Sequence, residues 1–395
     1  MRLSGRFIAI LGAAAALACS APSAGRPAPA SGSTHFILDG NRIYAELAFV
    51  RRDGSLRRTL AYVDMGSPAM SVSAPLLKEL GADSAHPVAF RIGGFPVTVP
   101  AAAIEPDPGP PGHAGGRPVE AMLAAGVLAR FELALDYRRR ILTLARPGAL
   151  RPSGIATPFH LDSKTGLIAV DARIDGRPYA LTIDNGSAWT WVRQSEVRAW
   201  LARHGDWARG VGAVGASNMM MVGDLEAAGL LARVPALRIG RLTLRDVDLL
   251  GPGPTTAFPF DLFDWYSRKN AVPVLGWIGG NVLKGFRITV DYPGHILYWQ
   301  RQAPPDRREL NQVGLVLRRD HGAYRVAGIA ARRGRPTVAG IRPGDRLIAI
   351  DGRPLTGASL GTVFAMLHGA PGARRMLRVE RDGETLTFEA RVTAF

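Results

Sequence analysis

The feature that most constrains this chain is an internal repeat. Two segments, 43–72 and 167–192, follow one plan: an apolar strand, an Asp-Gly turn, a second apolar strand and an Asp-x-Gly-Ser turn. The first turn is Asp64-Met65-Gly66-Ser67 and the second is Asp184-Asn185-Gly186-Ser187. The same order twice predicts a duplicated structural unit within one chain.

Each copy closes with a second shared motif. Small residues, a leucine and a phenylalanine lead into Asp136-Tyr137 in the first copy and into Asp291-Tyr292 in the second. Asp136 follows Asp64 by 72 residues, whereas Asp291 follows Asp184 by 107 residues. The second copy therefore holds extra loops, which we expect within 200–231 and 252–273.

The segments between these motifs are short, alternate apolar with polar residues and are bounded by Gly, Pro, Asp or Asn, as in 90–99, 237–249 and 287–299. This pattern predicts a mainly β protein with antiparallel pairing. Helical periodicity is sparse, and the clearest short helices are expected at 75–80 and 194–204, each just after an Asp-x-Gly-Ser turn.

The two turns carry a candidate catalytic pair. A single aspartate on a tight turn is usually an ordinary loop residue, but a pseudo-twofold axis can bring Asp64 and Asp184 together. Two carboxyl groups at hydrogen-bonding distance cannot both ionise cheaply, so they share a proton. The ionised group can then take a proton from water while the neutral group polarises a scissile carbonyl.

The neighbouring residues fit this role. Gly66 and Gly186 allow the two loops to approach closely, because neither has a Cβ. Ser67 and Ser187 each lie three residues after the aspartate, where we expect the hydroxyl to donate to the outer carboxylate oxygen.

At these residues the chain resembles the aspartic peptidases of the pepsin and retropepsin type. The closer match is the run from Asp184 to Val192, and the closing motifs resemble those of bacterial retropepsin-like proteins. The resemblance covers roughly residues 35–300. It implies two tandem acid-protease-type β-barrel halves, 35–150 and 151–303, which form a pseudo-dimer with Asp64 and Asp184 as the catalytic dyad.

The chain departs from this family at one position of each turn. The family normally has Thr or Ser after the aspartate, and its hydroxyl crosses to the opposite loop and locks the two turns together. Here the residues are Met65 and Asn185, and only asparagine can donate a hydrogen bond. Two outcomes stay open: the interlock is rebuilt asymmetrically, or the dyad is misaligned and inactive.

A separate β-rich unit with one helix is expected at 304–395, after Pro304-Pro305 as a hinge. The stretch 339–352 resembles the most recognisable part of bacterial PDZ domains. This resemblance implies that the backbone of Gly314, Leu315, Val316 and Leu317 takes the C-terminal carboxylate of a peptide, which adds as a strand. The helix flanking that groove is expected at 360–367.

The N-terminus has the features of a secretory signal. Residues 1–19 have two early arginines, an apolar run and small residues before Cys19, the single cysteine of the chain. The stretch 16–19 resembles a bacterial lipobox, which implies lipidation of Cys19 and a flexible tether at 20–34. The alternative is an ordinary Ala-x-Ala cleavage site, but both readings predict an exported protein of the periplasm or cell envelope.

Composition excludes several other classes. The formal charge is +16, but only four of the 49 basic residues are lysine and their clusters are short, so we predict no nucleic-acid partner. No serine-nucleophile turn and no His-Glu-x-x-His pair occurs, and we predict neither a cofactor nor a metal site.

Two functions remain. The first is an exported aspartic endopeptidase whose PDZ domain recruits or gates polypeptide substrates. The second is a catalytically inactive envelope protein that uses the same fold to bind peptides. The two functions differ in whether Asp64 and Asp184 catalyse peptide hydrolysis.

Overall fold

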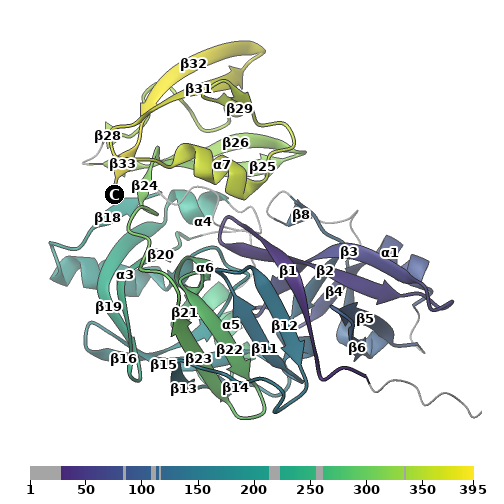
Figure 1. Ribbon diagram of the computed structural model, residues 1–395. Coiled ribbons are helices and arrows are strands. Elements are labelled where there is room, and N and C mark those ends of the chain that lie inside the picture. The colour runs from purple at the N-terminus through teal and green to yellow at the C-terminus, as the bar shows by residue number, and fades with distance from the viewer. Residues whose placement is uncertain are drawn as a thin grey trace, which may run out of the picture.

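The computed structural model describes residues 28–82, 86–107, 113–114, 117–212, 223–254, 261–332 and 335–395. The predicted signal, Cys19 and most of the predicted tether lie outside these ranges. The described chain is mainly β with a few short helices, as the alternating segments predict (Figure 1). In the part of the chain that is described, no helix is long and apolar enough to cross a membrane.

The predicted repeat is present as two series of elements in the same order. We refer to residues 35–150 as the first half and to 151–303 as the second half. The first series is β2 (Arg42–Val50), β3 (Leu56–Asp64), β4 (Met70–Ser73), α1 (Ala74–Leu80), β10 (Ala121–Ala124), α2 (Ala125–Leu128), β11 (Glu132–Asp136) and β12 (Ile141–Ala145). The second is β15 (Ile168–Ile174), β16 (Arg177–Ile183), β17 (Thr190–Val192), α3 (Gln194–Arg203), β21 (Gly276–Ile278), α6 (Gly280–Leu283), β22 (Phe286–Asp291) and β23 (Ile296–Arg301).

Strand pairing within the two halves is equivalent as well. In the first half, β10 pairs parallel with β3 and antiparallel with β4. In the second, β21 pairs parallel with β16 and antiparallel with β17. Each aspartate turn therefore leaves its strand beside a strand that leads into the closing motif.

The halves are joined by six antiparallel strands along the bottom of Figure 1. Their order is β13 (Ile155–Pro158), β23, β22, β11, β12 and β1 (Ser31–Asp39). The central pair is β11 with β22, in which Ala134 lies opposite Thr289. The strands on either side of this pair correspond one to one, so a pseudo-twofold axis runs between β11 and β22.

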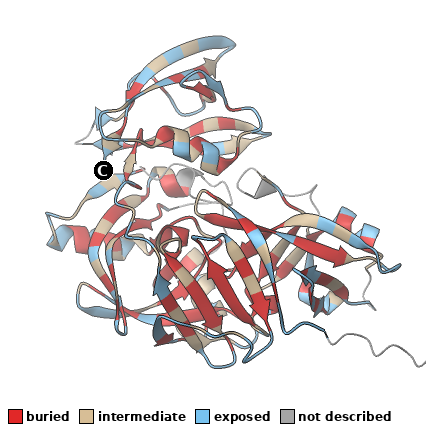
Figure 2. Cartoon of the chain, in the orientation of Figure 1, coloured by how far each residue is buried: buried red, intermediate tan, exposed pale blue. Residues whose placement is uncertain are grey.

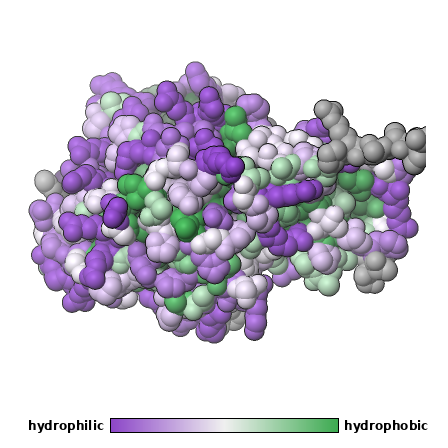
Figure 3. Space-filling view, turned by 60° about the horizontal axis from the view of Figure 1, so that its bottom comes forward, coloured by the Kyte–Doolittle hydropathy of each residue, from purple (hydrophilic) through white to green (hydrophobic). Residues whose placement is uncertain are grey.

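Apolar residues of both halves form one continuous core. Strand β3 is buried from Ala61 to Asp64, and β11 is buried along its whole length, because both run through the interior (Figure 2). On the face seen in Figure 3, hydrophilic residues predominate and apolar ones lie in separate groups. The remaining elements of the halves are β5 (Val88–Ile92), β6 (Phe95–Val99), the 3₁₀ turn η1 (Ala101–Ala103), β7 (Ile104–Asp107), β8 (His113–Ala114), β9 (Arg117–Pro118), β14 (His160–Leu161), β18 (Arg209–Val211), α4 (Gly223–Ala227), β19 (Leu230–Ile239), β20 (Leu242–Gly251) and α5 (Leu262–Lys269).

The C-terminal unit has its own sheet and its own core. The sheet order is β25 (Leu315–Asp320), β26 (Ala323–Ile329), β29 (Arg346–Ile350), β31 (Arg374–Arg381) and β32 (Glu384–Arg391), with β25 at one edge. Helix α7 (Leu360–Leu367) is at the predicted position, is capped by the Ser359 hydroxyl and buries Leu360, Val363 and Leu367 against this core. The short strands β24 (Asn311–Gln312) and β33 (Thr393–Ala394) pair with each other.

The C-terminal unit is docked on both halves rather than separated by a free linker (Figure 1): the Ser359 hydroxyl donates to Asp39 of the first half at 2.8 Å, and further contacts are made with the second half. Helix α4 lies against β25 and β26, and a Cβ at Gly328 would meet the Cβ of Ala227 at 2.7 Å. Val211 of β18 also pairs with Ala331 of β27 (Ala331–Arg332). One of the two extra loops predicted for the second half thus provides the surface on which the C-terminal unit rests.

Candidate active site

Asp64 and Asp184 are brought together at the junction of the two halves. Asp64 is the last residue of β3 and Asp184 follows directly after β16. Both are buried, with relative exposures of 9% and 4%. Each carboxyl group lies against the glycine of the opposite turn, and the two groups are close enough to shift each other's pKa. The structure therefore forms the pair that the repeated turns predict.

The two glycines of the turns permit this contact. A Cβ built on Gly66 would overlap the carboxyl group of Asp184, and one built on Gly186 would overlap the carboxyl group of Asp64. Each loop thus places its glycine backbone against the aspartate of the other half, as expected from the lack of a Cβ.

The closing motifs hold the two turns by equivalent backbone hydrogen bonds. In the first half, the Ala125 amide donates to the Ser67 carbonyl oxygen at 2.9 Å. In the second, the Gly280 amide donates to the Ser187 carbonyl oxygen at 2.7 Å. This contact explains why two separate motifs repeat together: the second motif is the support of the first.

The serines act differently from the expectation. The Ser67 hydroxyl donates to the Ala69 carbonyl oxygen at 3.4 Å, and the Ser187 hydroxyl donates to the Trp189 carbonyl oxygen at 2.7 Å. The carboxylates instead accept backbone amides, from Gly66 to Asp64 at 2.8 Å and from Ser187 to Asp184 at 2.9 Å. Each hydroxyl therefore bonds within its own turn, to a carbonyl oxygen two residues further along the chain.

The interlock between the loops is asymmetric. The Asn185 amide nitrogen donates to the Val63 carbonyl oxygen at 2.8 Å, and its side-chain oxygen accepts the Met65 amide at 2.8 Å. The Met65 side chain is buried in the apolar core. In the opposite direction, the Tyr62 hydroxyl donates to the Gly186 carbonyl oxygen. The loops are therefore tied from both halves by different residue types.

Burial and mutual proximity set the ionisation of the dyad. Burial raises the pKa of Asp64 to about 6, although the Gly66 amide and Asp184 counteract this. Burial and the charge of Asp64 raise the pKa of Asp184 well above its usual range. The pair therefore carries one shared proton over a range of pH that begins near 6, where Asp64 loses its proton.

The sequence analysis missed Tyr266, which lies at the dyad. Its hydroxyl is next to the Asp184 carboxyl, and burial together with the two aspartates raises its pKa well above the usual range. Tyr266 lies on α5, in the second of the predicted extra loops, and its ring packs on Trp277 at a centroid distance of 4.8 Å. No motif marks it, because only the tertiary position of α5 brings it to Asp184.

The C-terminal unit contacts the loop that follows Asp184. The ring of Phe364, on α7, meets that of Trp189 edge to face at 6.5 Å. The Asn41 amide donates to the Ala188 carbonyl oxygen at 3.3 Å and to Glu309, whose carboxylate also pairs with Lys284. The second turn is therefore linked directly to the C-terminal unit.

The expected carboxylate-binding loop is packed in this structure. Gly314 has a φ of 88°, and Leu315, Val316 and Leu317 are at most 2% exposed. A Cβ on Gly314 would meet the ring of Phe395, the last residue, at 3.0 Å. The loop is thus at the start of the edge strand β25, as expected, but the end of the chain lies against it.

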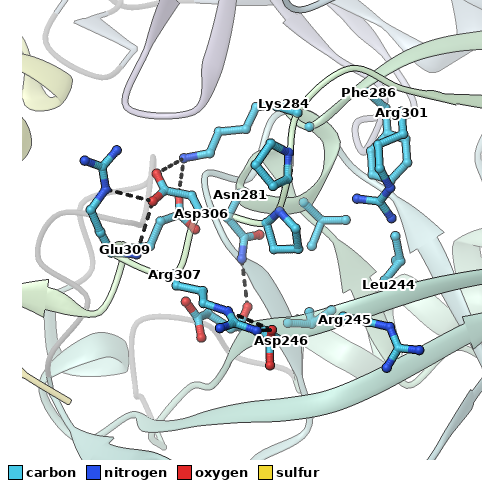
Figure 4. A pocket seen from close by; sticks show the side chains of 18 of the residues that line it. Leu244, Arg245, Asp246, Asn281, Lys284, Phe286, Arg301, Asp306, Arg307 and Glu309 are labelled. Atoms are coloured by element: carbon cyan, nitrogen blue, oxygen red, sulfur yellow. Dashed lines mark hydrogen bonds and ion pairs between the residues drawn. The ribbon is translucent and has the colours of Figure 1, made fainter.

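A cavity of about 580 Å³ lies where the second half leads into the C-terminal unit (Figure 4). The chain from Ala303 to Glu309 forms one wall. Lys284 bridges Asp306 and the buried Glu309, and Arg307 pairs with Asp246 on β20 at 2.6 Å. The predicted hinge at Pro304-Pro305 is therefore followed by a segment that ion pairs fasten to the second half.

The described residues contain no group of three or more His, Cys, Asp or Glu side chains that could hold a metal ion. The polar groups at the dyad are the two carboxyl groups and the backbone amides that donate hydrogen bonds to them.

Comparison with known proteins identifies one part of the chain. No curated protein matches it. Among solved structures, a photosystem II D1 C-terminal processing protease is similar, with 24% identity over 22% of this chain and 23% of that chain and a TM-score of 0.19. This chain thus spans less than a quarter of that protein. Residues 327–381 match the PDZ-domain family, and this part of the C-terminal unit is a PDZ domain.

Proposed function

We propose that this chain is an aspartic endopeptidase with Asp64 and Asp184 as its catalytic dyad. One observation carries the proposal: two buried carboxyl groups, from equivalent turns of a duplicated unit, each lie against the glycine of the opposite turn, so that the two groups meet at the pseudo-twofold axis. The resemblance of these turns and of the closing motifs to pepsin and retropepsin-like proteins supports the same reading.

The reaction follows from the unequal ionisation of the pair. Asp64, the more acidic group, is ionised and accepts a proton from a water molecule, whose oxygen attacks the peptide carbonyl carbon. Asp184 is neutral and gives its proton to the carbonyl oxygen, so that a neutral tetrahedral diol forms. Asp64 then gives its proton to the amide nitrogen while Asp184 takes a proton from one diol hydroxyl, so that the C–N bond breaks, a carboxylic acid and an amine leave, and the pair again carries one proton.

The PDZ domain would recruit or gate polypeptide substrates. PDZ domains generally bind peptides by adding them to a strand edge. The contact of α7 with Trp189, just after the second turn, gives such binding a physical route to the dyad. We also propose export to the periplasm or cell envelope, with lipidation at Cys19, from the N-terminal sequence alone.

The second candidate is a catalytically inactive peptide-binding envelope protein. It is favoured by the low exposure of the dyad and by the side chain of Tyr266 next to Asp184. In this case the duplicated fold and the PDZ domain would serve binding alone.

Cleavage of an unfolded polypeptide by the full chain distinguishes the two. Asp64→Asn and Asp184→Asn should each lower the rate at least ~10²-fold, since each removes one partner of the acid–base pair. Asp171→Asn is the control, because this carboxylate is exposed and bonded to His160 at 3.0 Å. Cleavage that survives both dyad changes would refute the peptidase assignment. Equal inertness of all forms, with retained capture of free C-termini, would favour binding.

A further inference from the structure

The interlock of the two turns lacks one of its expected parts. In one direction Asn185 both donates to Val63 and accepts from Met65. In the other direction the equivalent side chain is Met65, which has no donor and is 1% exposed in the apolar core. The first half must therefore hold the Asp184 loop by another residue.

Tyr62 makes that connection. It lies on β3, two residues before Asp64, and its hydroxyl donates to the Gly186 carbonyl oxygen across the junction. The side chain is 1% exposed and packs on the ring of Tyr44 at a centroid distance of 5.4 Å. Burial and the nearby Asp64 raise the pKa of Tyr62 well above its usual range. The hydroxyl thus keeps its proton and remains a donor.

The Gly186 carbonyl group, which accepts the Tyr62 hydrogen bond, belongs to the part of the loop that contacts Asp64. A Cβ on Gly186 would overlap the Asp64 carboxyl, so the Gly186 backbone lies directly against that group. A bond that fixes this backbone also fixes how closely Asp184, two residues earlier, approaches Asp64. Loss of the bond would leave a buried carbonyl without its donor and let the loop shift.

We infer that Tyr62 is a positioning residue of the dyad, which supplies the crossing hydroxyl that Met65 cannot. This inference rests on the proposed function for its kinetic consequences. Its structural content, that Tyr62 holds the Asp184 loop against Asp64, is independent of turnover.

The test is Tyr62→Phe in the full chain, which keeps the ring and removes the hydroxyl. We expect kcat to fall about 10-fold and KM to change less than twofold. A 10-fold decrease corresponds to the loss of roughly one hydrogen bond that positions the dyad. Met65→Thr, introduced into Tyr62→Phe, should restore at least a third of the lost activity, because it returns a crossing hydroxyl. Tyr44→Phe is the matched control, since no hydrogen-bond partner of its hydroxyl is found in the described part of the chain.

A second readout needs no catalysis. The raised pKa values of the dyad make the native state less stable as pH rises from about 4 to 7, because the unfolded carboxyl groups have already lost their protons. In a loosened pair the charge of Asp64 raises the pKa of Asp184 less, so the melting temperature of Tyr62→Phe should fall less steeply over this range than that of Tyr44→Phe. An identical slope, or an unchanged kcat in an active enzyme, would overturn the inference. A wild type that cleaves nothing would instead refute the proposed function, and the slopes would still decide the role of Tyr62.

Discussion

The absence of a side chain at Gly66 and Gly186 is the tightest constraint at the residue scale. Each glycine lies so close to the aspartate of the opposite loop that a Cβ on the glycine would overlap the carboxyl group. The dyad is therefore built as much by these two positions as by the carboxyl groups themselves.

Gly186→Ala tests this constraint. The added methyl group would collide with the Asp64 carboxyl and force the loops apart, so we expect a loss of ~1–3 kcal/mol in unfolding free energy and a loss of most peptidase activity. Gly205→Ala is the control, because no heavy atom lies within 4 Å of the added Cβ. Chemical denaturation and cleavage rates provide the measurements. Wild-type behaviour of Gly186→Ala would show that the loops are not in this contact.

Single residues were predictable to different degrees. The proximity of the aspartates and glycines could be predicted, because it follows from residue type and from the repeated spacing. The direction of the Ser67 and Ser187 hydroxyls could not, since it depends on whether a carbonyl or a carboxylate oxygen lies nearer. Tyr62 and Tyr266 carry no motif, and only the tertiary fold brings their hydroxyls to the second turn.

Elements of the second half distinguish it from the first. Helices α4 and α5 lie in the two segments that make the second copy longer. Helix α4 packs on β25 and β26 of the PDZ domain. Helix α5 carries Tyr266 to Asp184. Helices α1 and α3 could be predicted from local pattern, and α7 from the resemblance to PDZ domains. The contacts of α4 and α5 could not, because a five-residue and an eight-residue helix are positioned by tertiary packing.

Helix α7 joins the PDZ domain to the second turn through one aromatic contact. Phe364→Ala removes the ring that meets Trp189, and we expect ~1–3 kcal/mol less stability of the docked arrangement because apolar surface becomes exposed. Limited proteolysis of the exposed chain at 303–308 should then be faster than in wild type. Met376→Ala, at a side chain that is 43% exposed on β31, should leave the rate unchanged. Equal rates for both variants would contradict a role of Phe364 in docking.

At the scale of the whole molecule, the chain combines a duplicated β unit with a PDZ domain that is packed against both of its halves. The six joining strands relate the halves by a pseudo-twofold axis, and this arrangement follows from the repeat in the sequence. The docked position of the PDZ domain was not predictable, since Pro304-Pro305 indicates a hinge but not the ion pairs that fasten the following segment.

The pH dependence of peptide cleavage by the full chain tests the central claim most directly. Catalysis needs one proton on the pair, so the rate should rise with pH as Asp64 loses its proton near pH 6, while burial and the charge of Asp64 favour the protonated form of Asp184. We expect the cleavage rate to increase with pH around a midpoint near pH 6. Asp64→Asn should abolish the activity and with it this pH dependence. A rate that is maximal near pH 3 and falls through pH 6, or cleavage that persists in Asp64→Asn with the same profile, would contradict it.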